Sequence, residues 1–194
     1  MHTRTIAVVA AMMVAGLAQA RQKNTVPAQA VTVCMGTALF EAGVAQMVTS
    51  EIFARIGVRM DWRSMNRCPA DAIQISFQAG NDPNQPPDAL AYAMPYERVH
   101  IRVFYDRVRR LGGDAEASLL GHVLAHEIGH ILQGVARHSE TGVMKPWFTP
   151  DDIFRMRRNL LLNFTSEDAD LIHDGIEGRI RQIGRLSQTS ESGK

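Results

Sequence analysis

The sequence has no excess of charge of either sign. Its 194 residues include 21 lysines and arginines and 20 aspartates and glutamates, which gives a formal net charge of +1. Nothing in that balance indicates a nucleic-acid partner or binding to an anionic membrane surface. Internal repeats and low-complexity tracts are also absent, and a chain of this length can bury a sizeable core. We therefore expect one globular domain with short flanking segments.

Long hydrophobic runs are absent too. The apolar stretch at residues 6–17 has twelve residues, whereas a helix that crosses a membrane needs about 20. It follows a short basic start, and Ala18-Gln19-Ala20 behind it has the small-x-small pattern of a signal-peptide cleavage site. No cysteine follows that site, so a lipid anchor is not expected. Residues 1–20 are thus predicted to be a secretory signal peptide, and the protein to be secreted or periplasmic without a stable membrane anchor after processing.

One short stretch has the pattern of a metal site: His126-Glu127-Ile128-Gly129-His130. Two histidines four residues apart project from one side of a helix, because four residues make slightly more than one helical turn. Two imidazole nitrogens can then reach one metal ion, and Glu127 can lie beside the water that the ion activates. This arrangement is typical of zinc-assisted hydrolysis with a carboxylate as general base.

A third ligand is expected after the helix, because a catalytic zinc ion usually has three protein ligands and one open position. Gly134 is suited to end the helix, since glycine adopts the left-handed conformation of a C-cap without steric cost. The chain can then turn back and bring His138 to the metal, and Met144 can form an apolar floor beneath the ligands. A downstream carboxylate, Glu140 or Glu167, is the alternative third ligand.

Two other histidines are expected to be structural. His122 lies one turn before His126, but three histidines at four-residue spacing do not close around one ion, because the ends of such a ladder lie about 12 Å apart along the helix. His100 falls in a predicted strand and is expected to be a satisfied polar residue.

This stretch and its surroundings resemble the metzincin metallopeptidases, most closely the matrixin branch. The match covers most of residues 72–160 and consists of LAYAMP at 90–95, HVLAHEIGH at 122–130, His138-Ser139, the Met-turn-like MKPWF at 144–148 and TPDDI at 149–153. It implies an edge strand along which an extended protein or peptide substrate lies, made of Leu90, Ala91, Tyr92 and Ala93. It also implies a pocket after the cleavage site, lined by Pro146, Trp147 and Phe148.

The sequence departs from that family pattern in two ways. The family has its glycine three residues and its third histidine six residues after the second ligand, whereas Gly134 and His138 follow His130 by four and eight residues. The histidines that hold a second, structural zinc ion in matrixins are missing: Tyr92 stands at one such position, and residues 80–88 contain none. We therefore expect one catalytic zinc ion, a third-ligand segment that is two residues longer, and no structural zinc.

Cysteine is scarce, with only Cys34 and Cys68 in the chain. In the oxidising compartment that a signal peptide implies, the simpler expectation is a disulfide between them. The alternative is that Cys34 is a thiolate that blocks the zinc in a latent form, although no motif of that kind surrounds it.

The hydrophobic periodicity, together with the resemblance, predicts an α+β domain: a twisted mixed β-sheet with an active-site helix, a Met-turn and C-terminal helices. Strands are expected at 30–33, 58–62, 72–77, 89–95 and 98–105, and helices at 38–55, 115–133, 151–162 and 166–185. Asp114 is expected to cap the active-site helix. The predicted division is a lead-in at 21–30, a catalytic domain at 31–165, a C-terminal helix at 166–186 and a disordered tail at 187–194.

These features together predict a secreted zinc-dependent endopeptidase, with Glu127 as general base and His126, His130 and His138 as zinc ligands. The alternative from a different class is a secreted binding module that keeps the scaffold but has lost turnover. The intact Glu127 favours the enzyme.

Overall fold

The structure is a computed structural model that describes residues 29–36, 41–80 and 85–191. The predicted signal peptide, most of the predicted lead-in and the expected start of the first helix lie outside these residues. Within the described residues, no helix is both long enough and apolar enough to span a membrane.

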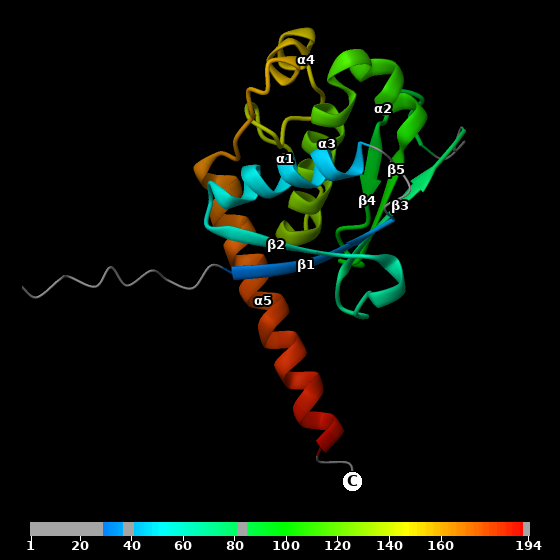
Figure 1. Ribbon diagram of the computed structural model, residues 1–194. Helices are drawn as coiled ribbons and strands as arrows, with labels where there is room; N and C mark the ends of the chain where they lie inside the picture. The colour runs from blue at the N-terminus through cyan, green and yellow to red at the C-terminus, as the bar shows by residue number, and fades with distance from the viewer. Residues whose placement is uncertain (1–28, 37–40, 81–84, 192–194) are drawn as a thin grey trace, which may run out of the picture.

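The described residues form a five-stranded sheet with the order β2-β1-β3-β5-β4 (Figure 1). β2, β1, β3 and β5 run parallel to one another, and β4 pairs antiparallel with β5 at one edge. This arrangement confirms the expected α+β class with a mixed sheet. The strands are β1 (Gln29–Met35), β2 (Val58–Arg63), β3 (Ile73–Gln78), β4 (Ala91–Ala93) and β5 (His100–Phe104).

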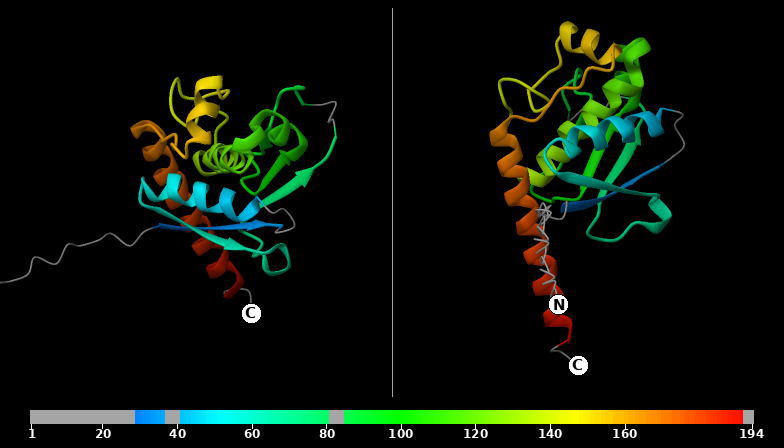
Figure 2. Two further views of the ribbon diagram at one scale, coloured as in Figure 1. Left: turned by 45° about the horizontal axis from the view of Figure 1, so that its top comes forward. Right: turned by 60° about the vertical axis from the view of Figure 1, so that its left-hand side comes forward.

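Helices cover one face of the sheet. Figure 2 shows α1 (Ala42–Ala54) and α3 (Glu116–Gln133) on the same side of the strands. Side chains alternate along a strand, so every second residue points toward these helices. The inward residues are buried and aliphatic, and include Val31, Val33, Val58, Ile73, Ile75, Ile101 and Val103. Outward positions such as Ala30, Arg59, Ser76 and His100 are polar or small and exposed, whereas Cys34 and Phe104 near the strand ends are buried. The hydrophobic core therefore lies between the sheet and α3, the helix that carries the predicted metal ligands.

The segment before α3 differs from the prediction. A helix, α2 (Tyr105–Gly112), directly follows β5 where the sequence predicts only the end of a strand. The expected cap of the active-site helix by Asp114 is wrong: a 3₁₀ turn at Gly113–Ala115 leads into α3, and no side chain caps it. Asp114 forms an ion pair with Arg157 instead, at 2.8 Å, so it joins this turn to α4 (Pro150–Arg157).

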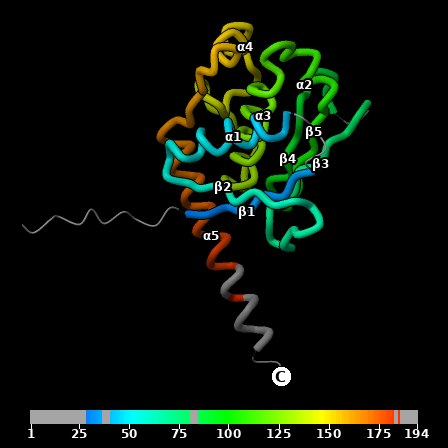
Figure 3. Tube along the Cα trace, viewed as in Figure 1, coloured from blue at the N-terminus to red at the C-terminus, as the bar shows by residue number. Residues whose placement is uncertain are grey.

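The two C-terminal helices have other lengths than expected. Thr149 and Asp152 form a capping box that starts α4, and Asn159 at a φ of 56° follows its end, so α4 is shorter than the predicted 151–162. The last helix, α5 (Ser166–Glu191), is longer and continues into the segment that was expected to be disordered. It begins beside α3 and projects past the sheet (Figures 1 and 3).

A disulfide joins Cys34 and Cys68, so neither cysteine is free. It ties the buried end of β1 to the loop between β2 and β3. The expected disulfide is thereby confirmed, and the alternative of a Cys34 thiolate over the metal is not supported.

α5 packs against α3 at a glycine. A methyl group on Gly175 would overlap the backbone carbonyl of Leu132, while Ile172 and Ile176 on either side are buried. The absence of a side chain at residue 175 therefore lets the two backbones approach closely, directly below the end of the ligand-bearing helix.

We predict that Gly175→Ala destabilises the fold by about 1–3 kcal/mol, because the added methyl group forces α5 away from α3. Gly178→Ala in the same helix is the matched control, since nothing lies within 4 Å of its Cβ position. That control should be neutral or up to about 1 kcal/mol more stable, because alanine favours the helix. Urea denaturation followed by circular dichroism measures both, and equal stability of the two variants would contradict the packing described.

Candidate metal centre

Three histidines converge at the end of α3. His126 and His130 lie one turn apart on the helix, which ends at Gly134 with a φ of 70° and a bond from the Gly134 N–H to the His130 carbonyl at 2.9 Å. The chain then reverses, as the sequence predicts, and brings back His138. One ring nitrogen from each of the three side chains lies within 4.8 Å of the other two. Within the described ranges, this is the group of ligating side chains that could hold a metal ion.

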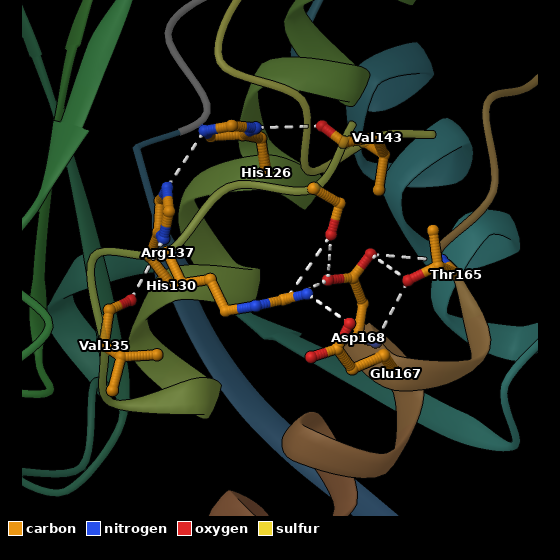
Figure 4. A network of polar contacts seen from close by, with 9 residues as sticks. His126, His130, Val135, Arg137, Val143, Thr165, Glu167 and Asp168 are labelled. Atoms are coloured by element: carbon orange, nitrogen blue, oxygen red, sulfur yellow. Dashed lines mark hydrogen bonds and ion pairs between the residues drawn. The ribbon is translucent and has the colours of Figure 1, made fainter. Parts of the chain in front are cut away.

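The backbone sets which nitrogen of each helical histidine is free. His126 Nδ1 bonds the Val143 carbonyl at 2.9 Å, and His130 Nδ1 bonds the Val135 carbonyl at 3.2 Å (Figure 4). A carbonyl oxygen only accepts, so Nδ1 carries the proton in both rings. Burial and the neighbouring imidazoles lower the pKa of His126 to about 3 and that of His130 to about 4, so both rings are neutral at neutral pH. Each Nε2 is then unprotonated and available to a metal.

The two free nitrogens lie close together. His126 Nε2 and His130 Nε2 are 3.0 Å apart, and in these tautomers neither carries a proton that could make the contact a hydrogen bond. Two facing lone pairs repel unless a cation lies between them. In a tetrahedral zinc site with Zn–N bonds of 2.0–2.1 Å, ligand nitrogens are roughly 3.3 Å apart. The donor set and its spacing therefore fit zinc.

His138 completes the set from a loop. Its ring stacks on His126 with the centroids 5.3 Å apart and meets the His130 ring edge-on at 5.0 Å. Burial against these rings lowers its pKa, although the side chain as a whole is exposed. Neither alternative carboxylate joins the group: Glu140 is exposed, and Glu167 forms an ion pair with Arg137 at 2.5 Å.

Met144 packs against α3 at Gly129, and its role as a floor beneath the metal ligands stays a prediction. It is fully buried, and its sulfur would be only 2.6 Å from a Cβ on Gly129, the residue before His130. The Ser139 N–H donates to the Met144 carbonyl at 2.9 Å, which closes a turn that contains Val143 and begins directly after His138. Glycine at residue 129 therefore leaves room for the methionine, and the ends of this turn are held together by the backbone bond.

Glu127 points into the cleft from the same helix turn. It is 7% exposed, and burial raises its pKa to about 8, although the backbone N–H of Ala93 opposes this by donating to the carboxylate. A bound cation would lower this pKa again. The structure thus places the Glu127 carboxyl in the same cleft as the three imidazoles.

A cleft of about 680 Å³ opens above the histidines. Its walls include all seven residues expected to bind substrate: Leu90, Ala91, Tyr92, Ala93, Pro146, Trp147 and Phe148. Trp147 is 72% exposed at the rim, and the Phe148 ring meets the His126 ring edge-on at 6.3 Å. The predicted residues are therefore brought together around one cavity that also contains Glu127.

The free edge of β4 faces this cleft. Leu90 and Met94 use their backbone groups to bond β5, through Phe104 N–H to Leu90 and Met94 N–H to His100. Backbone groups alternate in direction along an antiparallel strand, so those of Ala91 and Ala93 point away from β5. The Ala93 N–H reaches Glu127, which agrees with this direction. The backbone of Ala91 and the carbonyl of Ala93 therefore lie on the open edge of the sheet.

One residue that holds the cleft wall has no signal in the local sequence. Arg107 of α2 is buried and donates to the carbonyls of Pro86 and Ala89, both at 2.8 Å, while its guanidinium lies over the Phe104 ring. It thereby fixes the chain that leads into β4. No local pattern points to this role, because the bonds span 18 and 21 residues of sequence.

The two other histidines in question have partners of their own. His122 is fully buried; its Nδ1–H donates to the Ser118 carbonyl at 2.7 Å, and its Nε2 accepts from the Leu162 N–H at 3.1 Å. Both nitrogens are thus occupied, as expected for a structural histidine. His100 contacts Glu97 on the outer face of the sheet. The expectation of one zinc ion without a structural one remains a prediction.

None of the protein-family models compared matches the chain, and no curated protein matches it. Five chains of solved structures do match its fold. One of these similar structures is archaemetzincin from Methanopyrus kandleri, with a TM-score of 0.53 and 13% sequence identity over 77% of this chain and 95% of that one. At this identity the likeness shows the fold, which is zincin-like as the resemblance implied. It does not support placement in the matrixin branch.

We predict that the protein binds one Zn²⁺ ion and that His138→Ala weakens zinc binding by more than about 100-fold. Removing a ligand should cost more affinity than the roughly 10- to 100-fold loss that follows removal of a residue that only orients a ligand. His100→Ala is the matched control and should bind as the wild type does. Chelator competition measures the affinities, with circular dichroism as a check on folding. Wild-type affinity in His138→Ala would point to a different third ligand, such as Glu140.

Proposed function

We propose that the protein is a secreted zinc-dependent endopeptidase. The observation that carries this proposal is the combination, in one cleft, of three convergent imidazoles, a buried glutamate and an open strand edge. His126, His130 and Glu127 come from α3, His138 comes from the loop after it, and the substrate surface comes from β4, so the fold brings together segments that are distant in the sequence.

His126, His130 and His138 would hold the zinc ion. When bound, zinc would act as a Lewis acid that polarises the scissile carbonyl and lowers the pKa of a water molecule, so that the water can lose a proton and attack near neutral pH. Glu127 takes the proton from the attacking water and later gives it to the leaving amine. Its burial favours this role, because a carboxyl whose pKa lies near the operating pH can both accept a proton and give it back.

The substrate would bind as an additional strand along β4. The outward backbone groups of Ala91 and the carbonyl of Ala93 can pair with an extended peptide, and such pairing gives affinity that does not depend on side chains. Pro146, Trp147 and Phe148 would line the pocket for the residue after the cut, which favours an apolar side chain there. The partner is therefore a protein or peptide in extended conformation.

Secretion is the part of the proposal that rests mainly on sequence. The apolar stretch and small-x-small site at residues 1–20 favour export. The Cys34–Cys68 disulfide fits the oxidising surroundings that an exported protein meets.

We expect Glu127→Gln to retain zinc and to lower peptide cleavage by about 10²- to 10⁴-fold, the usual contribution of a general base. The assay is cleavage of a mixed peptide library by residues 21–194 in the presence of zinc, with mass spectrometry of the products. An active Glu127→Gln enzyme would contradict the general-base assignment.

The same assay distinguishes the enzyme from the binding module. If the zinc-loaded wild type cuts no peptide while it retains zinc and its fold, the catalytically silent module is favoured. If it does cut, the residue after each cut reports on the pocket at residues 146–148.

A further inference from the structure

Asp168, in the first turn of α5, is a buried carboxylate with four hydrogen-bond donors. Its exposed fraction is 0%. One oxygen, Oδ2, accepts from the Thr165 N–H at 3.1 Å and from the Thr165 hydroxyl at 2.7 Å, while the Asp168 N–H donates back to that hydroxyl at 3.2 Å. This is a capping box at the start of α5. The capping box uses only one of the two carboxylate oxygens, Oδ2.

The other oxygen reaches out of the helix to the third-ligand segment. Asp168 Oδ1 accepts from Arg137 Nη1 at 2.8 Å and from the Ser139 hydroxyl at 2.6 Å (Figure 4). Arg137 and Ser139 are the residues immediately before and after His138. Arg137 also pairs with Glu167 of the same helix at 2.5 Å. Both chain neighbours of the third histidine are therefore held by one buried group on α5.

His138 needs such a tether more than the other two ligands do. His126 and His130 are part of a helix whose backbone fixes their spacing, whereas His138 lies in a segment without regular structure. Val135, Ala136 and His138 in this segment are exposed, so core packing does not hold it. The segment is also held by the Ser139–Met144 backbone bond, by the bond of Val135 to His130 and by the Arg137–Glu167 ion pair. Asp168 is the group that bonds both residues flanking His138.

The burial of Asp168 also argues for a role beyond capping. A carboxylate is costly to bury unless it is paired and fully hydrogen-bonded, and a helix N-terminus at the surface is capped without that cost. Here the cap is placed under the loop, where an arginine and a serine from residues 137 and 139 satisfy the remaining oxygen. The pairing makes the loop position and the helix start depend on each other.

We propose that Asp168 is a positioning residue that holds His138 in place to bind the metal, and that α5 is thereby coupled to the metal centre. The proposal rests on the zinc site of the proposed function, but not on peptidase activity. Asp168 acts through residues 137 and 139 and does not touch the metal or the substrate.

A double-mutant cycle on zinc affinity tests this. Asp168→Ala should weaken Zn²⁺ binding by about 10-fold or more, as removal of groups that orient a ligand does. If Asp168 acts through His138, the same change in a His138→Ala background should have no further effect, so the two changes are not additive. Chelator competition on the full folded chain gives all four affinities.

Thr165→Ala is the matched control for helix capping. It removes the hydroxyl that bonds Oδ2 but leaves both contacts of Oδ1, so it should lower stability without changing zinc affinity. Should Asp168→Ala fail to fold, Ser139→Ala removes one of the two tethers alone and should weaken zinc binding in the wild-type background and not in His138→Ala.

Two results would overturn the proposal: zinc affinity unchanged on loss of the tether, or weakened equally with and without His138. The second would mean that Asp168 supports the fold in general. These results are separate from the test of function, because a protein that passes the cycle but cuts no peptide would contradict only the peptidase. A wild type that binds no zinc would contradict both.

Discussion

Two unprotonated imidazole nitrogens 3.0 Å apart are a repulsive contact unless a cation lies between them, and much of the structure serves to hold them there. The carbonyls of Val143 and Val135 occupy the opposite nitrogens, so neither ring can relieve the contact by changing its tautomer without losing a hydrogen bond. Burial keeps both rings neutral. The site is thus preorganised for a metal ion, since the orientation of the ligands is set before the ion arrives.

That preorganisation depends on how closely other elements approach α3. Gly121 admits α1, where a methyl group would lie 2.6 Å from Val48 Cβ, and the Thr49 hydroxyl bonds the Gly121 carbonyl at 2.9 Å. Gly129 leaves room for the Met144 side chain, and Gly175 of α5 lets that helix approach the backbone at the end of α3. Each glycine lies at a contact with a different element. The helix that carries the ligands is therefore held by α1, the Met-turn and α5, and a shift of any of these reaches the histidines.

The parts of this arrangement that could be predicted from sequence are those with short-range patterns. The spacing of His126 and His130, the helix end at Gly134 and most strands follow from local periodicity and local steric preference. The role of His138 required family resemblance, because its distance from His130 is unusual. Its place beside the other ligands follows from a chain reversal that the sequence only permits.

What could not be predicted depends on contacts between distant segments. α2 carries few apolar residues, and tertiary contacts such as those of Arg107 and Val108 support it more than periodicity does. Asp168 bonds Ser139 and Arg137, which lie 29 and 31 positions earlier in the chain. Its local capping pattern therefore shows only half of its hydrogen bonds. The length of α5 was underestimated because its polar sequence resembles a tail. In each case the deciding interaction is absent from the local sequence window.

The proposed metal centre requires that three imidazoles hold one zinc ion. X-ray absorption at the zinc edge, on the full chain loaded with one equivalent of Zn²⁺, tests it most directly. We expect three nitrogen ligands at about 2.0–2.1 Å with the outer-shell scattering of imidazole rings, and a further light atom from solvent. Fewer than three imidazoles, or a carboxylate in place of His138, would contradict it.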